Sequence, residues 1–181
     1  MCIRDSDGET YQIDYEPGES HTTLFGGNSN WRGPVWFPIN FLIIEAMQRF
    51  HHYYGEEFLI ECPVGSGEMV TIRAAARELA SRLTSLFMKD PGGKRPFLGD
   101  NQKLQTDPHF AGLIQFNEYF EGETGRGCGA SHQTGWTGLI AKIIERYYGS
   151  GTDGHDREVQ ELGLGTETLS LIHISEPTRP Y

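Results

Sequence analysis

TIRAAARELASRLTSLFMK, residues Thr71–Lys89, decides the fold class, because its apolar residues recur with the period of an α-helix. Thr71 has the side chain of a helix N-cap, and the arginines of this stretch lie away from the apolar positions. We therefore expect an amphipathic helix from Thr71 to about Lys89 that buries one stripe. The stripe consists of Ile72, Ala76, Leu79, Leu83 and Phe87.

An earlier helix is expected to open at Pro38, because proline suits the first helical position, and to end at Gly55 as a C-terminal cap. This helix places His51 and His52 on its polar, solvent-facing side. Its apolar positions, three or four residues apart, are Ile39, Ile43, Met47, Phe50 and Tyr54.

A third helix is expected from about Thr134 to Tyr148, with Gly149 as its stop. Its inward residues are Trp136, Ile140, Ile143 and Tyr147. The connections are long: 7–30 and 90–108 are rich in polar residues, Gly and Pro, and only Phe58–Val64 and Leu113–Tyr119 suit short extended segments. No βαβ alternation is present, so we predict an all-α fold of the toroid type, with loops gathered at the mouth of a cavity.

Composition excludes several classes of function. The chain has 181 residues, 37% of them hydrophobic and 22% charged, which is typical of a globular domain with a core. Its net charge of -10 argues against a nucleic-acid partner. The longest apolar stretch, Val35–Met47, is too short to cross a membrane. The three cysteines form no disulfide pattern, which favours a reducing, cytoplasmic location.

Both ends differ from the rest of the sequence. Residues 1–6 (MCIRDS) and 169–181, which include SLIHISEPTRPY, resemble translated sequencing-adapter read-through and are set aside as non-native. We expect 7–149 to be part of a larger catalytic domain and 150–168 to be a flexible polar tail. The chain is then expected to be a piece of a longer protein.

Glu118 is the first candidate for chemistry, because Phe116, Tyr119 and Phe120 surround it in the sequence. It is either a surface carboxylate whose neighbours point inward or a general base that faces a cavity. A base would require an oxygen-rich substrate, ring walls and a second carboxylic acid across the cavity. The glycine-rich stretch after it, 122–129, allows left-handed backbone and close approach to a ligand, or is only a tight turn. It lacks the ending of a phosphate-binding loop.

Trp31, Arg32 and Trp36 form a second cluster, in which two indoles around a guanidinium could stack a sugar and bind a hydroxyl or carboxylate. Alternatively, Trp36 is only the hydrophobic start of the helix and Arg32 a surface ion-pair partner. Asn40 lies one turn into the helix and either faces the cavity or caps it.

His132, Gln133 and Trp136 form the third cluster, with His132 either a substrate contact or a structural histidine. No metal or other cofactor is expected, because the spacings of Cys62, His109, Cys128 and His132 match no zinc pattern. Cys128 lacks the His and Asn partners of a nucleophile.

Two stretches carry a family resemblance: GGNSNWRGPVWFPINFL (Gly26–Leu42) and FNEYFEGETGRGCGASHQTGWTGLIAK (Phe116–Lys142). They resemble the C-terminal part of the catalytic domain of glycoside hydrolase family 63, which includes processing α-glucosidase I and is related to the mannosylglycerate hydrolases. The resemblance covers most of 26–148.

The resemblance implies a partial (α/α)6 toroid and an inverting α-glycosidase acting on an α-glucoside or α-mannoside. Glu118 matches the general base of the family. The positions that match the sugar subsite are Trp31, Arg32, Trp36 and Trp136, beside which Asn40, Tyr119, His132 and Gln133 are further candidate contacts.

The general acid of the family lies far upstream of the base, so we expect this chain to lack it and to be inactive alone. Asp100 and Asp107 are too close in sequence to Glu118 to replace it. Two alternatives stay open. One is a carbohydrate-binding or scaffold domain that does not need Glu118. The other is a lyase or epimerase on a similar toroid, in which His132 or Tyr119 would act.

Overall fold

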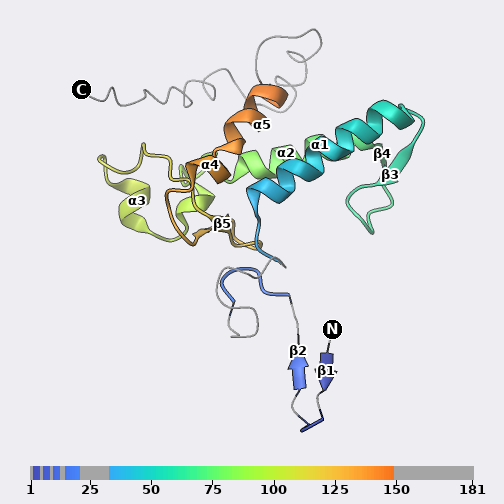
Figure 1. The fold of residues 1–181 in the computed structure, drawn as a ribbon. Helices are drawn as coiled ribbons and strands as arrows, with labels where there is room; N and C mark the ends of the chain where they lie inside the picture. Colours follow the sequence, from blue (N-terminus) through green and yellow to red (C-terminus); the bar gives the residue numbers. More distant parts are fainter. Residues whose placement is uncertain (1, 5, 9, 13–14, 21–32, 149–181) are drawn as a thin grey trace, which may run out of the picture.

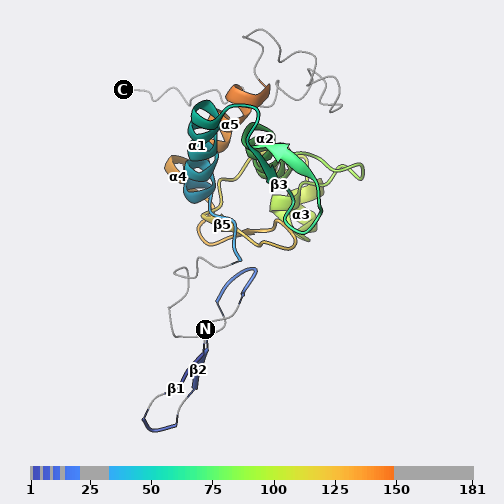
Figure 2. The same ribbon diagram turned by 90° about the vertical axis from the view of Figure 1, so that its right-hand side faces the viewer.

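The computed structural model describes residues 2–4, 6–8, 10–12, 15–20 and 33–148 of the chain (Figure 1). The described part is mostly helical, as the sequence predicted. Its helices are α1 (Phe37–Tyr54), α2 (Ile72–Ser85), η2 (Pro96–Leu98), α3 (Gln102–Thr106), α4 (Thr134–Thr137) and α5 (Leu139–Tyr148). In Figures 1 and 2, α1 and α2 lie side by side and α5 packs against both.

The core lies between α1, α2 and α5. Each helix buries an apolar face there. Removing apolar surface from water stabilises the fold by about 25 cal/mol per Å². On α2 the predicted stripe is buried except for Leu79, which is partly buried, and on α5 the predicted inward residues are also buried. The principal core residues are Phe37, Ile44, Ala76, Ala80, Leu83, Phe87, Phe120, Ile140 and Ile143.

The predicted apolar face of α1 is wrong in orientation. Phe37, Ile44 and His51 are its buried residues, whereas Ile39, Ile43, Phe50 and Tyr54 are exposed. The apolar residues of α1 cover two adjoining faces, and the period alone does not distinguish them. Met47, which was also predicted to face inward, is partly buried and packs against the core. His51 is therefore buried, contrary to the prediction, and its Nε2 lies 3.1 Å from Glu56 Oε1; His52 is exposed, as predicted.

Three short antiparallel hairpins complete the described elements. β1 (Cys2–Arg4) pairs with β2 (Thr10–Gln12), β3 (Leu59–Glu61) with β4 (Met69–Thr71), and β5 (Tyr119–Phe120) with β6 (Gly127–Cys128). β3 and β5 fall within or at the end of the two segments that the sequence predicted could be extended. The pairings themselves were not predicted, because the paired strands are only two or three residues long and show no alternating apolar pattern.

Thr71 caps α2, as predicted, through its Oγ1, which accepts from the Ala74 amide at 3.2 Å. The predicted third helix is divided at Gly138 into α4 and α5. The predicted stop of that helix, Gly149, lies outside the described residues. The long connection 90–108 contains η2 and α3.

Candidate functional site

Backbone pairing brings Glu118 close to the start of α1. Val35 and Phe120 exchange backbone hydrogen bonds of 2.8 and 3.0 Å, which ties β5 to the residue before Trp36. On the other side, the Gln133 amide donates to the Phe116 carbonyl at 2.8 Å and joins the same strand to the start of α4. Segments more than eighty residues apart in sequence therefore meet at Glu118.

Three rings pack together beside this strand. Trp36 and Tyr119 are stacked, with centroids 4.7 Å apart, and Trp136 meets Trp36 edge-on at 6.2 Å. Trp36 and Tyr119 are buried at 4% and 1% exposure, whereas Trp136 is only partly buried. Of the three rings, Trp136 is consequently the one most accessible to a ligand.

Burial shifts the titration of two groups in this cluster. It raises the pKa of the Tyr119 phenol to about 12, with smaller contributions in the same direction from nearby acidic groups that include Glu118. Burial also raises the pKa of the Cys128 thiol, which packs against the same rings. Tyr119 is therefore a neutral hydrogen-bonding group at physiological pH, and Cys128 lacks the depressed pKa of a nucleophile.

The carboxylate of Glu118 points toward the residues that follow β6. Its Oε2 accepts a hydrogen bond from the Ala130 amide at 3.2 Å. A Cβ placed on Gly129 would lie 2.5 Å from that oxygen and 2.9 Å from Tyr119 Cε1. The carboxylate and the Tyr119 ring therefore share the space beside Gly129, and Glu118 is partly buried.

The glycines of 122–129 serve close packing as well as turning. A Cβ on Gly127 would stand 2.3 Å from the side-chain amide of Asn117, the residue before Glu118. Asn117 is also fixed through its backbone, because the Thr137 hydroxyl donates a hydrogen bond to the Asn117 backbone carbonyl. Thr137 is fully buried. Asn117, Gly127 and Thr137 were not among the predicted site residues, and no side-chain pattern singles them out.

The remaining predicted site residues differ in their placement. Asn40 is bonded to the start of its own helix, since its Nδ2 donates to the Trp36 carbonyl at 2.8 Å. His132 and Gln133 are exposed at the start of α4, next to the segment that carries Glu118. Trp31 and Arg32 lie outside the described residues.

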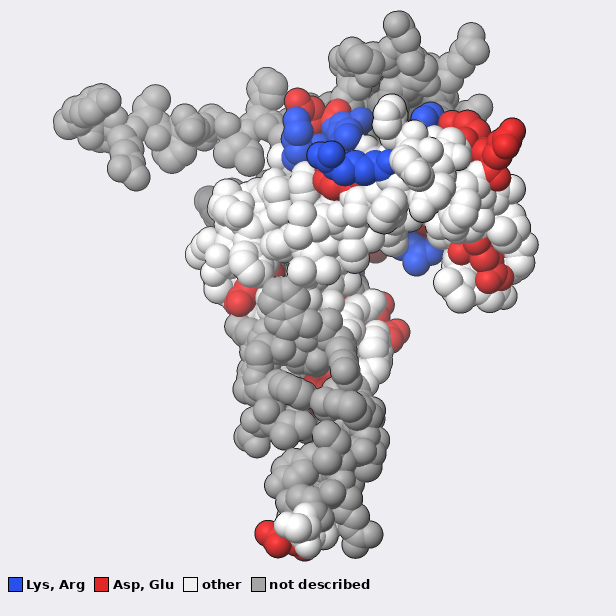
Figure 3. Space-filling model, turned by 45° about the vertical axis from the view of Figure 1, so that its right-hand side comes forward, with Lys and Arg blue, Asp and Glu red and all other residues white. Residues whose placement is uncertain are grey.

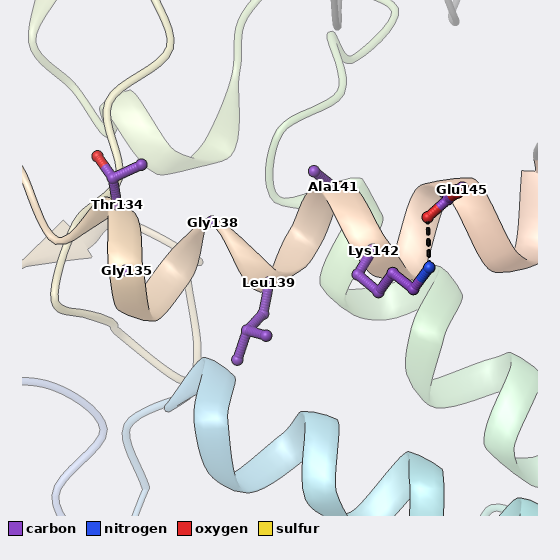
Figure 4. Close-up of a pocket in the computed structure, with 7 residues that line it drawn as sticks. All are labelled: Thr134, Gly135, Gly138, Leu139, Ala141, Lys142 and Glu145. Atoms are coloured by element: carbon purple, nitrogen blue, oxygen red, sulfur yellow. Dashed lines mark hydrogen bonds and ion pairs between the residues drawn. The ribbon is translucent and has the colours of Figure 1, made fainter.

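Other kinds of site are not found in the described residues. No group of three or more His, Cys, Asp or Glu side chains there could hold a metal ion, and none of the helices searched is long and apolar enough to cross a membrane. A shallow groove lies along α4 and α5, where Gly135 and Gly138 leave the backbone uncovered (Figure 4). It is separate from Glu118 and is bordered by the Lys142–Glu145 ion pair, at 2.6 Å.

Comparison with known proteins identifies the family. A family model described as "Mannosylglycerate hydrolase MGH1-like glycoside hydrolase domain" matches residues 10–137. The chain belongs to this family. The match confirms the resemblance to family 63 glycoside hydrolases and their mannosylglycerate-hydrolase relatives that the two sequence stretches indicated.

Two proteins of Saccharomyces cerevisiae are similar to this MGH1-like glycoside hydrolase chain. The uncharacterized protein YMR196W is 55% identical over 139 residues, which are 76% of this chain and 13% of that protein. The mannosyl-oligosaccharide glucosidase is 28% identical over 124 residues, which are 68% of this chain and 12% of that protein. The chain thus spans about an eighth of the length of these relatives. No solved structure matches the chain.

Proposed function

We propose that this chain supplies the general base and part of the sugar subsite of an inverting α-glycosidase. The observation that carries the proposal is the position of Glu118 in a glycoside hydrolase domain, immediately before β5, whose first residue, Tyr119, stacks on Trp36. Ring faces suit the C–H side of a sugar, and a fixed carboxylate beside them suits activation of water. The substrate class is an α-glucoside or α-mannoside.

The reaction proceeds as a single displacement. Glu118 takes a proton from water as the water oxygen bonds to the anomeric carbon, and the glycosidic C–O bond breaks on the opposite face. The leaving oxygen takes a proton from a carboxylic acid that stands about 6.5–9.5 Å from the base in inverting enzymes. We assign that acid to a longer polypeptide, in which α1, α2 and α5 form part of an (α/α)6 toroid.

Burial divides the proposed subsite into two groups. Trp136, His132 and Gln133 are accessible enough to contact a sugar directly. Trp36 and Tyr119 are buried and support the Trp136 ring from behind. Trp31 and Arg32, outside the described residues, complete the proposed subsite on the strength of the family resemblance alone.

The test is Glu118→Gln in the longer protein that contains this sequence, assayed with aryl α-glucosides and α-mannosides. We expect a loss of about 10²–10⁴-fold in kcat with substrate binding retained, because the amide cannot accept the proton. Glu57→Gln, at an exposed position in the turn between α1 and β3, is the matched control and should keep full activity.

Two further readings of the same assay decide between the alternatives. The first sugar released by the wild-type protein should be the β-anomer by NMR, since the mechanism inverts the anomeric carbon. Retained activity in Glu118→Gln would contradict the assignment of the base. Binding without any hydrolysis by the wild type would favour a carbohydrate-binding domain, and an unsaturated or epimerised product would favour a lyase or epimerase.

We further propose that the 181-residue chain is inactive by itself, because its acid partner lies elsewhere. The purified chain should release no sugar from the same substrates. Measurable turnover that disappears in Glu118→Gln would contradict this part of the proposal.

A further inference from the structure

The backbone opposite Glu118 does not continue the register of β5 and β6. The pairs Tyr119–Cys128 and Phe120–Gly127 set the register of β5 and β6, and one more step would place Glu118 opposite Gly129. The Glu118 amide instead donates to the Ala130 carbonyl at 2.8 Å. Gly129 has a φ of +67°, in the left-handed region. The β5–β6 ladder therefore ends at the Tyr119–Cys128 pair, and the left-handed Gly129 brings Ala130, in place of Gly129 itself, opposite Glu118.

The end of the ladder at Gly129 leaves the amide of Ala130 free to bond a side chain. In a regular antiparallel ladder, a residue that accepts from its partner also donates to the partner's backbone carbonyl. Here the Ala130 amide donates to the side-chain Oε2 of Glu118, at 3.2 Å. Ala130 thus holds both the backbone and the carboxylate of Glu118. A backbone N–H to an ionised carboxylate is a charge-assisted bond with a defined direction.

Only glycine can occupy position 129. A Cβ on Gly129 would stand 2.5 Å from Glu118 Oε2 and 2.9 Å from Glu118 Cβ, distances that real Cβ atoms do not tolerate. The left-handed φ adds backbone strain for any other residue. A side chain at 129 would therefore push the carboxylate out of its present orientation.

We infer that Gly129 and Ala130 are positioning residues, which hold the Glu118 carboxylate at the angle required to take a proton from the attacking water. This inference rests on the proposed function of Glu118 and adds to it the backbone element that orients the base. Because the element acts on the orientation of the base, its loss should lower kcat and leave KM nearly unchanged.

The experiment compares Gly129→Ala and Ala130→Pro with Glu118→Gln in the longer protein that contains this sequence. Proline removes the Ala130 N–H and leaves its carbonyl in place. Gly67→Ala is the matched control, because Gly67 also has a left-handed φ, of +76°, but a Cβ there meets no atom within 4 Å. We expect kcat to fall about 10–100-fold in both test variants, with KM within about threefold, since a misplacement near 1 Å costs on this order.

A second measurement uses the 181-residue chain and requires no activity. Amide hydrogen exchange by NMR should show that Glu118→Ala increases exchange at Ala130, because the acceptor of its N–H is removed. Gly67→Ala should leave both kcat and this exchange rate unchanged.

The outcomes separate this inference from the proposed function. Normal kcat in Gly129→Ala and Ala130→Pro, together with lost activity in Glu118→Gln, would overturn the positioning role and leave the base assigned. Unchanged exchange at Ala130 in Glu118→Ala would also overturn it. Full activity in Glu118→Gln would instead remove the proposed function, and the positioning role with it.

Discussion

Tyr119 connects the proposed base to the ring cluster, since it follows Glu118 as the first residue of β5 and stacks on Trp36. Its phenol is removed from solvent, and burial raises its pKa to about 12. At any physiological pH it carries its proton and can donate a hydrogen bond. Tyr119 therefore adds no charge beside the proposed sugar subsite.

The raised pKa of Tyr119 gives a stability prediction with a definite sign. The neutral phenol is favoured in the folded chain, so the unfolded chain loses its proton first as the pH rises through about 10. The Tyr119 contribution is fully present below pH 10 and is lost as the pH rises toward 12. Urea unfolding at pH 8 to 11.5 should show this loss, and Tyr119→Phe should show a smaller decrease than the wild type. Equal decreases in both proteins would contradict the assignment.

The sequence predicts which side chains could take part in chemistry better than it predicts how those side chains are arranged in space. The sequence singled out Glu118, Tyr119 and Trp136 because a carboxylate among rings is visible in the order of residues. It could not indicate that Ala130 donates its amide to Glu118. Any residue but proline can donate a backbone hydrogen bond, so its partner is set by register and not by side-chain type.

At the scale of elements, α2 is a helix in which the local sequence features, its N-cap and apolar stripe, agree with the packing in the fold. Thr71 caps its first turn, and Ile72, Ala76 and Leu83 face the core. Predicting this helix from the sequence succeeded because its outer face is polar, with Arg73, Glu78 and Arg82 exposed.

The cap of α2 can be tested directly. Thr71→Ala should lower the free energy of unfolding by about 1 kcal/mol, because the Ala74 amide loses its acceptor. The measurement is urea unfolding followed by circular dichroism. Ser81→Ala is the control, since position 81 lies in the helix interior, where alanine has the higher helix propensity, and it should not destabilise the chain. An equal loss in both variants would argue against a specific cap.

α1 shows that a hydrophobic pattern predicts a helix without determining which of its faces is buried. Its residues at 37, 44 and 51 and those at 39, 43, 50 and 54 both repeat at helical spacing, on adjoining faces. Periodicity predicts a helix from either set but does not say which set faces α2 and α5. Packing against those two helices decides the question, and it buries His51 in place of Phe50.

For the whole molecule, the second apolar face of α1 is a large exposed surface. Ile39, Leu42, Ile43, Phe50, Tyr53 and Tyr54 are each at least 39% exposed. In Figure 3, Lys and Arg side chains gather along the upper part of one view and a broad uncharged surface extends below them. A helix that is apolar on two faces is usually buried on both. This fits the proposed toroid, in which further helices of a longer polypeptide would pack on this face.

The 181-residue chain alone should therefore self-associate, because contiguous exposed apolar surface of several hundred Å² drives association. Multi-angle light scattering should give a mass that rises with concentration, and Leu42→Lys with Phe50→Lys should lower it toward the monomer. The control adds two lysines outside α1, Ser85→Lys on α2 and Gln102→Lys on α3, at exposed neutral positions that leave the α1 face intact. These variants should associate like the wild type. A wild-type chain that stays monomeric at high concentration would show that this face needs no cover, and it would weaken the case that further helices pack there in the longer protein.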